Sequence, residues 1–245
     1  MRGSNPLFNS QRFGTRAHVV DESAVMTIQG TMNKTIIMLF LTFLAATFTW
    51  EQYFSGNQSS GLLMLGVFGG LIAAMATIFK PNWSPISAPV YAILEGLFLG
   101  GISALYAHMY QGIVMQAVGL TFGVMFVMLF LYRSGTIKVT EKLRSGIIAA
   151  TGAIALFYFV SIILSFFGIG MPLLHSNGLF GIGFSLVVVG VAAFNLLLDF
   201  DFIEHASREG MPKYMEWYAG FGLMVTLIWL YLEILRLLAK LQSRD

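Results

Sequence analysis

Four acidic residues lie inside long apolar stretches of the sequence, and they are the side chains best placed to do chemistry. They are Glu95, Asp199, Asp201 and Glu233. A charged side chain at the centre of a bilayer costs roughly 2.5–3.5 kcal/mol on insertion scales. A carboxylate kept at such a position is therefore expected to have a function or a charged partner.

The apolar stretches contain no Lys or Arg at a matching depth. The carboxyl groups are therefore expected to be protonated, hydrated, paired with one another or bound to a cation. Burial and a neighbouring like charge both favour the protonated form of a carboxyl group, and a buried acidic pair can share one proton. Loss of that proton leaves oxygen ligands, which hard cations prefer. The pattern predicts a pH-sensitive cation pathway.

Local ion pairs are the alternative explanation for the acids of the sixth stretch. Asp199 and Asp201 point roughly 200° apart on a helix, so they cannot both face the same partner. Asp201 with His205, and Glu204 with Arg208, are spaced four residues apart. Pairs at that spacing are often ordinary ion pairs on a helix surface.

The other two acids differ in their surroundings. Glu233 lies three residues before Arg236, which is close enough for a local ion pair at the membrane interface. Glu95 has no such neighbour in the sequence. Its alternative is a neutral acid that donates a hydrogen bond to a nearby backbone carbonyl.

Membrane helices must position these residues, as the composition indicates. The 245-residue chain is 57% hydrophobic and 11% charged, whereas a soluble domain is about 25% charged. A helix needs about 20 apolar residues to cross the bilayer, and backbone groups in lipid must pair within the segment. Seven stretches qualify, namely Thr35–Tyr53, Gly61–Phe79, Ile86–Ala107, Ile113–Tyr132, Ser145–Phe167, Leu179–Phe202 and Tyr214–Leu235. We expect an all-α polytopic membrane protein, with a seven-transmembrane-helix bundle over residues 35–238 and tails at 1–34 and 239–245.

Positive charges are distributed unequally between the two sides of this bundle. With the N-terminus inside, the tail and the loops on its side hold 11 Lys and Arg residues, and the three opposite loops hold none. Cytoplasmic loops carry such an excess, so we expect a cytoplasmic N-terminal tail, and the lack of cysteine fits a bacterial inner membrane. Arg236, Lys240 and Arg244 would then snorkel at the far interface, unless the last segment does not cross fully.

Several function classes are excluded by what the sequence lacks. There is no cysteine, which excludes disulfides and thiolate chemistry. The four histidines form no pair of the kind that binds zinc, and no Gly-x-Ser-x-Gly elbow occurs. Asp199 and Asp201 share one helix, whereas protease aspartates must converge from different elements. A net charge of +2 without a basic stripe argues against nucleic acid. We expect no enzyme activity and no bound cofactor.

Glycine pairs at four-residue spacing occur in three of the expected spans. They are Gly66 with Gly70, Gly96 with Gly100, and Gly119 with Gly123. Small residues at that spacing let helix backbones approach closely. We predict a packing role for Gly96 and Gly100, although glycine is also simply common in membrane spans.

Three segments of the chain carry a family resemblance. They are Ala88-Pro89-Val90-Tyr91 followed by Glu95-Gly96-x-x-x-Gly100, the run from Asn195 to Asp201, and Glu216-Trp217 followed by Leu230-Tyr231-Leu232-Glu233. In combination with seven spans, these segments resemble the Bax inhibitor-1/YccA-like membrane proteins, in their bacterial branch. The resemblance covers about residues 30–240.

The resemblance implies a fold with a central last helix and a pH-sensitive Ca²⁺ leak gated by acids of the sixth and seventh helices. It maps Asp201 first to the sixth-helix acid, because Asp201 follows an aromatic residue, with Asp199 as the rival. Glu233 matches the seventh-helix acid by its Leu-Tyr-Leu context. A different alignment puts that acid near Thr226, and Glu95 would then supply the second carboxylate.

The sequence therefore predicts passive, proton-regulated movement of Ca²⁺ or a similar cation. Asp201 with Glu233 or Glu95 would form the gate and the transient cation ligands, and Ca²⁺ and H⁺ would be permeant or regulatory ions. The alternative is a non-conducting partner of other membrane proteins, such as a quality-control protease or a stress-response complex. Glu95 and Asp201 in one interior cavity would favour conduction, and separate interfaces would favour the partner. A proton-coupled carrier has less support, because no repeat with two broken helices is visible.

Overall fold

The computed structural model describes residues 25–57, 60–168 and 178–243, which are helical almost throughout. Seven helical segments are long and apolar enough to cross a membrane. The only β-type contact within these residues is an isolated bridge between Val25 and Pro212. The predicted all-α bundle with seven spans is confirmed.

The helices run in chain order as follows: α1 (Ile28–Phe54), α2 (Ser60–Met64), α3 (Gly70–Phe79), α4 (Ser84–Met109), α5 (Ile113–Arg133), α6 (Glu141–Phe166), α8 (Leu179–Arg208) and α9 (Met215–Gln242). A π-helical turn, η3 (Leu65–Gly69), joins α2 to α3, and a 3-10 turn, η4 (Pro81–Trp83), leads into α4. The second and third spans are therefore Ser60–Phe79 and Pro81–Met109.

Several helices extend beyond the apolar stretches that identified them. Helix α1 begins at Ile28 rather than Thr35, where the Thr27 side chain accepts a hydrogen bond from the Gly30 amide. Of the expected tail, residues 1–24 lie outside the described residues, and residues 28–34 belong to α1. Helix α6 likewise begins at Glu141 after the capping residue Thr140. Polar end turns are invisible to hydropathy because capping, rather than burial, stabilises them.

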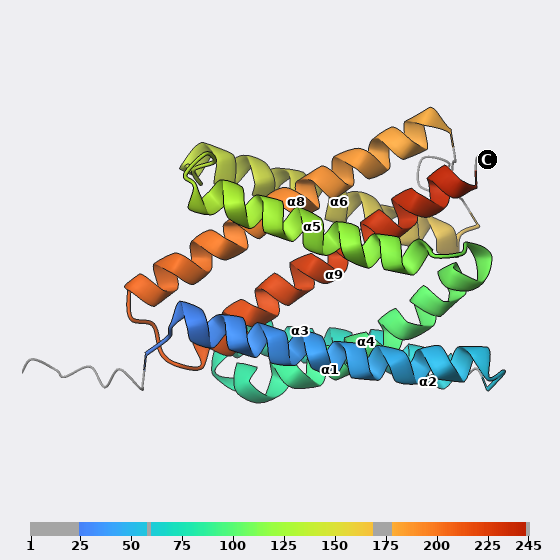
Figure 1. Ribbon diagram of the computed structural model, residues 1–245, viewed down its shortest axis with the longest axis horizontal. Coiled ribbons are helices and arrows are strands. Elements are labelled where there is room, and N and C mark those ends of the chain that lie inside the picture. Colours follow the sequence, from blue (N-terminus) through green and yellow to red (C-terminus); the bar gives the residue numbers. More distant parts are fainter. Residues whose placement is uncertain (1–24, 58–59, 169–177, 244–245) are drawn as a thin grey trace, which may run out of the picture.

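Helix α9 lies at the centre of the bundle (Figure 1), as the family resemblance implied. It packs against α1, α4, α5 and α8, and it is the most buried of the seven spans. Two apolar clusters meet on its surface. One includes Leu227 and Leu230 and extends to α5 and α8, and the other includes Met224 and Ile228 and extends to α1, α3 and α4.

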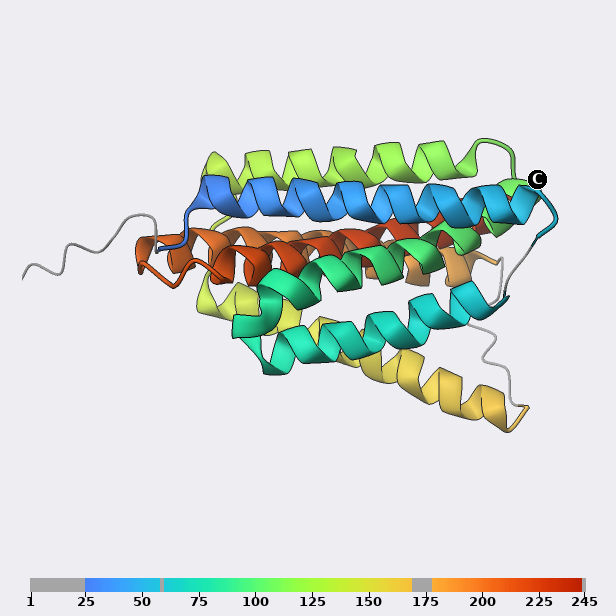
Figure 2. The same ribbon diagram turned by 90° about the horizontal axis from the view of Figure 1, so that it is seen from below.

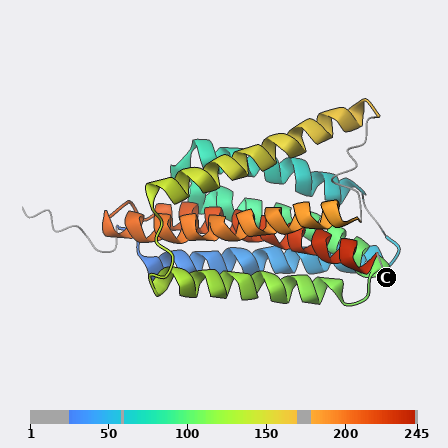
Figure 3. The same cartoon turned by 90° about the horizontal axis from the view of Figure 1, so that it is seen from above.

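Helix α6 is the least integrated span. It packs mainly against α8, and it diverges from the other helices toward its C-terminal end (Figures 2 and 3). Large apolar side chains such as Leu156, Phe159 and Phe166 are exposed along it. Such an outward face is suited to contact with lipid. Helix α6 is therefore a peripheral helix, attached mainly to α8.

Two of the three glycine pairs lie where helices touch. A Cβ atom on Gly96 or Gly100 would collide with the backbone of α1, at Thr42 and Ala46 respectively. A Cβ atom on Gly66 would lie 2.8 Å from the Leu94 carbonyl oxygen of α4. No heavy atom lies within 4 Å of a Cβ atom placed on Gly119 or Gly123, within the described chain. Close contact therefore involves the glycines of η3, α3 and α4 but not those of α5.

Replacing Gly100 with Leu is expected to destabilise the bundle, because the side chain would force α4 away from α1. Overpacking costs about 1–3 kcal/mol or more. The measurement is the thermal unfolding midpoint of purified protein in detergent, followed by tryptophan fluorescence. Gly123→Leu adds the same side chain at an open position and should leave the midpoint almost unchanged. Equal midpoints for the two variants would contradict the packing role.

Candidate functional site

Eight of the ten Lys and Arg residues in the described ranges gather at the end of the bundle where α1 and α9 begin, whereas Arg236 and Lys240 lie toward the opposite end, near the C-terminus of α9. We call the end with the eight residues the basic end, and its residues are Lys34, Lys80, Arg133, Lys138, Lys142, Arg144, Arg208 and Lys213. The hydroxyl of Ser84 at the start of α4 donates to the Tyr214 carbonyl at 2.8 Å, which joins the α3–α4 and α8–α9 connections at this end.

Asp201 is buried near the basic end of α8 and is paired with an arginine. Its Oδ2 atom accepts a hydrogen bond from Nη2 of Arg144 on α6 at 2.5 Å. The Nδ1 atom of His205 lies 3.3 Å from Oδ1. The expectation that the carboxyl groups are protonated, hydrated, paired with one another or bound to a cation was therefore wrong for Asp201, which forms an ion pair with Arg144. Helix α6 begins one turn earlier than expected, and a long arginine side chain can extend from a helix end along apolar surface.

Asp199 faces a different helix from Asp201, as the roughly 200° between them requires. A Cβ atom on Gly222 of α9 would lie 3.8 Å from Oδ1 of Asp199. Thr226 of α9 is a further neighbour of Asp199, and its hydroxyl donates to the Gly222 carbonyl at 3.3 Å. The Oδ2 atom is buried and has no hydrogen-bond partner among the described residues. Thr226 is the position to which one alignment assigned the second acid of the family, so Asp199 rather than Asp201 faces that position.

Glu233 belongs to a separate cluster on α9. Both of its carboxylate oxygens accept hydrogen bonds from Nη1 of Arg236 at 3.0 Å, so the local ion pair considered from the sequence is present. The Tyr158 hydroxyl of α6 donates to Glu233 at 2.9 Å and accepts from Arg236 at 2.8 Å. Thr226 lies beside Asp199, and Glu233 lies seven residues further along α9, which is about 10 Å at 1.5 Å per residue. The structure does not bring Asp201 and Glu233 together.

Glu95 is half-buried on α4, where it faces α3. Its Oε2 atom lies 3.1 Å from a Cβ atom placed on Gly70. It makes no hydrogen bond or ion pair with any residue that the structure describes. No group of three His, Asp or Glu residues that could hold a metal ion occurs in the described ranges. Glu95 and Asp201 therefore occupy separate interfaces.

A line of polar contacts runs along the face that α6 turns toward α8 and α9. Arg144, Thr151 and Tyr158 are seven residues apart and so lie on one side of the helix, over about 21 Å. Their partners are Asp201, Asn195 and Glu233, at 2.5, 2.8 and 2.9 Å. We call these six residues the polar seam. Sequence reasoning missed Thr151 and Tyr158, although their spacing from Arg144 was visible.

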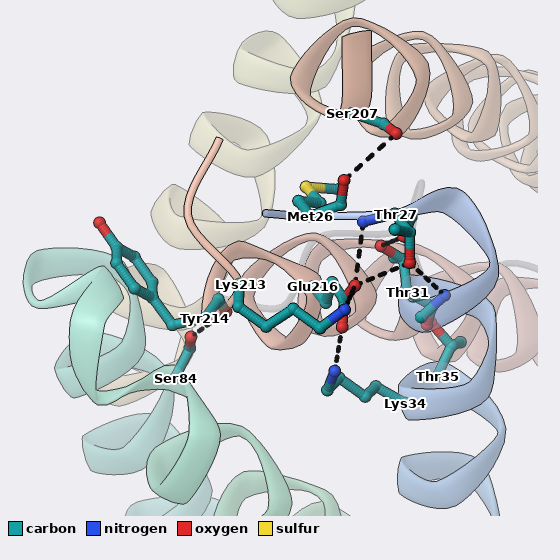
Figure 4. A network of polar contacts seen from close by, with 11 residues as sticks. Met26, Thr27, Thr31, Lys34, Thr35, Ser84, Ser207, Lys213, Tyr214 and Glu216 are labelled. Atoms are coloured by element: carbon teal, nitrogen blue, oxygen red, sulfur yellow. Dashed lines mark hydrogen bonds and ion pairs between the residues drawn. The ribbon is translucent and has the colours of Figure 1, made fainter. Parts of the chain in front are cut away.

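A second network involves Glu216, which sequence reasoning noted only as part of a motif. Its carboxylate is fully buried at the start of α9 and is paired with Lys34 of α1 and with Lys213, the latter at 2.9 Å (Figure 4). It also accepts hydrogen bonds from the amide and hydroxyl of Thr27, both at 2.9 Å. A Cβ atom on Gly30 would overlap this carboxylate. The network fixes the beginning of α1 to the beginning of α9.

Comparison with known protein families matches residues 5–243 to the family described as Bax inhibitor 1 like. Comparison with curated proteins finds no match. The family match covers nearly the whole chain, and it confirms the resemblance that the sequence motifs indicated. The chain belongs to the Bax inhibitor 1 like family and is a multi-pass membrane protein with seven apolar helices.

Proposed function

We propose that this protein is a proton-regulated leak for Ca²⁺ or a similar cation, and that the ion crosses along the polar seam. The seam is the observation that carries the proposal. It places carboxylates at two depths, with Asp199 nearby on α8, over about 21 Å of helix. Carboxylate and carbonyl oxygens are the ligands that Ca²⁺ prefers, and polar residues inside a membrane bundle commonly mark ion pathways.

In this structure, arginine side chains occupy the sites beside the carboxylates where a permeating cation would bind. Arg144 neutralises Asp201, and Arg236 neutralises Glu233. A cation could bind either carboxylate only after the guanidinium moves away. The side chain of Arg144 is 42% exposed, so it has room to turn toward water. This conformation therefore corresponds to the closed state of the proposed leak.

Protonation of Asp201 would open the basic end of the seam. A neutral carboxyl group no longer forms an ion pair with Arg144, which releases the first turns of α6 from α8. His205 also faces Asp201, and its protonation would compete with Arg144 for the same carboxylate. Tyr132 of α5 and Glu204 of α8 are also close by and are hydrogen-bonded to each other at 2.5 Å, and Glu204 is paired with Arg208. Both protonation steps weaken the hold of Arg144, so acidification should raise the flux.

We place the basic end on the cytoplasmic side of a bacterial inner membrane, because positive charge collects on that side. Within this proposal Ca²⁺ and H⁺ are transported or regulatory ions, and the protein catalyses no reaction. The alternative is a non-conducting partner of other membrane proteins, such as a membrane protease. One observation favours it: Glu95 and Asp201 face separate interfaces rather than one cavity.

The first test is Ca²⁺ flux into proteoliposomes over a pH series that brackets neutrality. Wild-type flux is expected to rise as the pH falls, and Asp201→Asn should show high flux with little pH response, because Asn cannot hold Arg144 by charge. Glu204→Gln is the matched control, because it neutralises a nearby acid outside the seam. Flux no greater than that of empty liposomes at every pH would reject the leak in favour of the partner function. A normal pH response in Asp201→Asn would move the sensor to another acid.

The second test removes the other half of the ion pair. Arg144→Gln is expected to raise flux at neutral pH by up to about fivefold, because a part-exposed ion pair contributes about 1 kcal/mol or less. The double variant with Asp201→Asn should conduct no more than either single variant, because the two residues form one contact. Lys142→Gln removes an equal charge from the same helix end and should have no effect. Additive effects in the double variant would show that the two residues act separately.

A further inference from the structure

An open groove of about 500 Å³ runs between α3 and α4. Its lining residues are almost all apolar, and they are Gly69, Ile72, Ala73, Ala76, Trp83, Ile86, Ser87, Val90 and Leu94. The hydroxyl of Ser87 is engaged by Thr77 at 2.7 Å and by the Trp83 carbonyl at 3.0 Å. The indole N–H of Trp83 is the one side-chain donor of this lining without a hydrogen-bond partner among the described residues. The occupant must therefore be apolar over most of the groove.

The groove opens toward the outside of the bundle, and α3 lies at the edge of the helices in Figure 2. Ile72 and Ile86 line it and remain 70% and 75% exposed. From Trp83 to Leu94 the groove follows α4 over eleven residues, or about 16 Å. That length is close to half of the roughly 30 Å hydrocarbon core. The groove therefore has the depth of one leaflet and the surface of an acyl-chain site.

The positive charge of Lys80 lies at the Trp83 end of the groove, which is the end nearer the membrane surface. The Nζ atom of Lys80 lies 4.2 Å from the centre of the Trp83 ring, and the described residues give Lys80 no ion pair. Trp and Lys are typical of the membrane interface, where they meet lipid headgroups. Helix α4 begins at the same place without a side-chain cap, so its positive dipole end adds to the attraction for an anion.

We propose that the α3–α4 groove binds one anionic phospholipid. An acyl chain lies against Ala73, Ala76 and Val90, and the phosphate lies beside Lys80 at the basic end. The apolar lining recognises the chain and Lys80 selects the negative headgroup. The site is separate from the polar seam, and its existence does not depend on the proposed leak.

The test uses the full chain with Trp83 as its only tryptophan, made by replacing Trp50, Trp217 and Trp229 with Phe. The protein is reconstituted into mixed vesicles in which either phosphatidylglycerol or phosphatidylcholine carries brominated acyl chains, which quench indole fluorescence on contact. We expect half-maximal quenching at about fivefold lower mole fraction of brominated phosphatidylglycerol, the factor expected from one Lys at an anionic membrane surface.

Two variants separate a specific site from general contact with lipid. Lys80→Gln should bring the ratio between the two lipids to about one, and Lys138→Gln, which removes a charge elsewhere at the basic end, should leave it unchanged. Native mass spectrometry of the chain with all four tryptophans repeats the comparison, in case the Phe replacements disturb folding. Equal binding of the two lipids, or a preference that survives Lys80→Gln, overturns the proposal.

Discussion

The bundle depends on neutralising the carboxylates that its helices carry away from water. A buried charge without a partner costs several kcal/mol, and breaking a buried pair leaves such a charge behind. Three buried acids are accordingly in contact with cations, and the pairs are Asp201 with Arg144, Glu233 with Arg236, and Glu216 with Lys34 and Lys213. Each cation keeps part of its side chain exposed, so its own charge is still hydrated.

These pairs divide the helices into a fixed group and a weakly held one. Helix α9 carries Glu216 at its beginning and Glu233 near its end, and four helices pack around it. Helix α6 is different, because it meets mainly α8 and its contacts include the polar seam. Apolar packing does not respond to protons, whereas an ion pair does. A proton signal would therefore act on the position of α6 while the core around α9 keeps its shape.

The spans were predictable because the bilayer sets both their length and their hydropathy. Partners three or four residues apart were predictable too, as Glu233 with Arg236 shows. The pairing of Arg144 with Asp201 was not, because hydropathy assigns Arg144 to a loop and no local spacing links α6 to α8. The burial of Glu216 was missed for a similar reason, because its ion-pair and hydrogen-bond partners come from the beginning of α1 and from the loop before α9. Partners across helices depend on packing angles that a single sequence does not reveal.

Of the four acids in the apolar stretches, Asp199 and Glu95 are the two that form no ion pair within the described chain. Their positions in the bundle suggest different roles. Asp199 lies beside α9 at a depth between the ion pairs of Asp201 and Glu233. In the proposed leak, an ion that displaced Arg144 from Asp201 would pass close to Asp199, whose side chain faces α9 rather than α6. The attraction between a positive charge and a buried carboxylate, which holds the three ion pairs together, would then also guide the ion. Glu95 lies between α3 and α4, outside this line, so its charge must be met by protonation or by water rather than by the same ion.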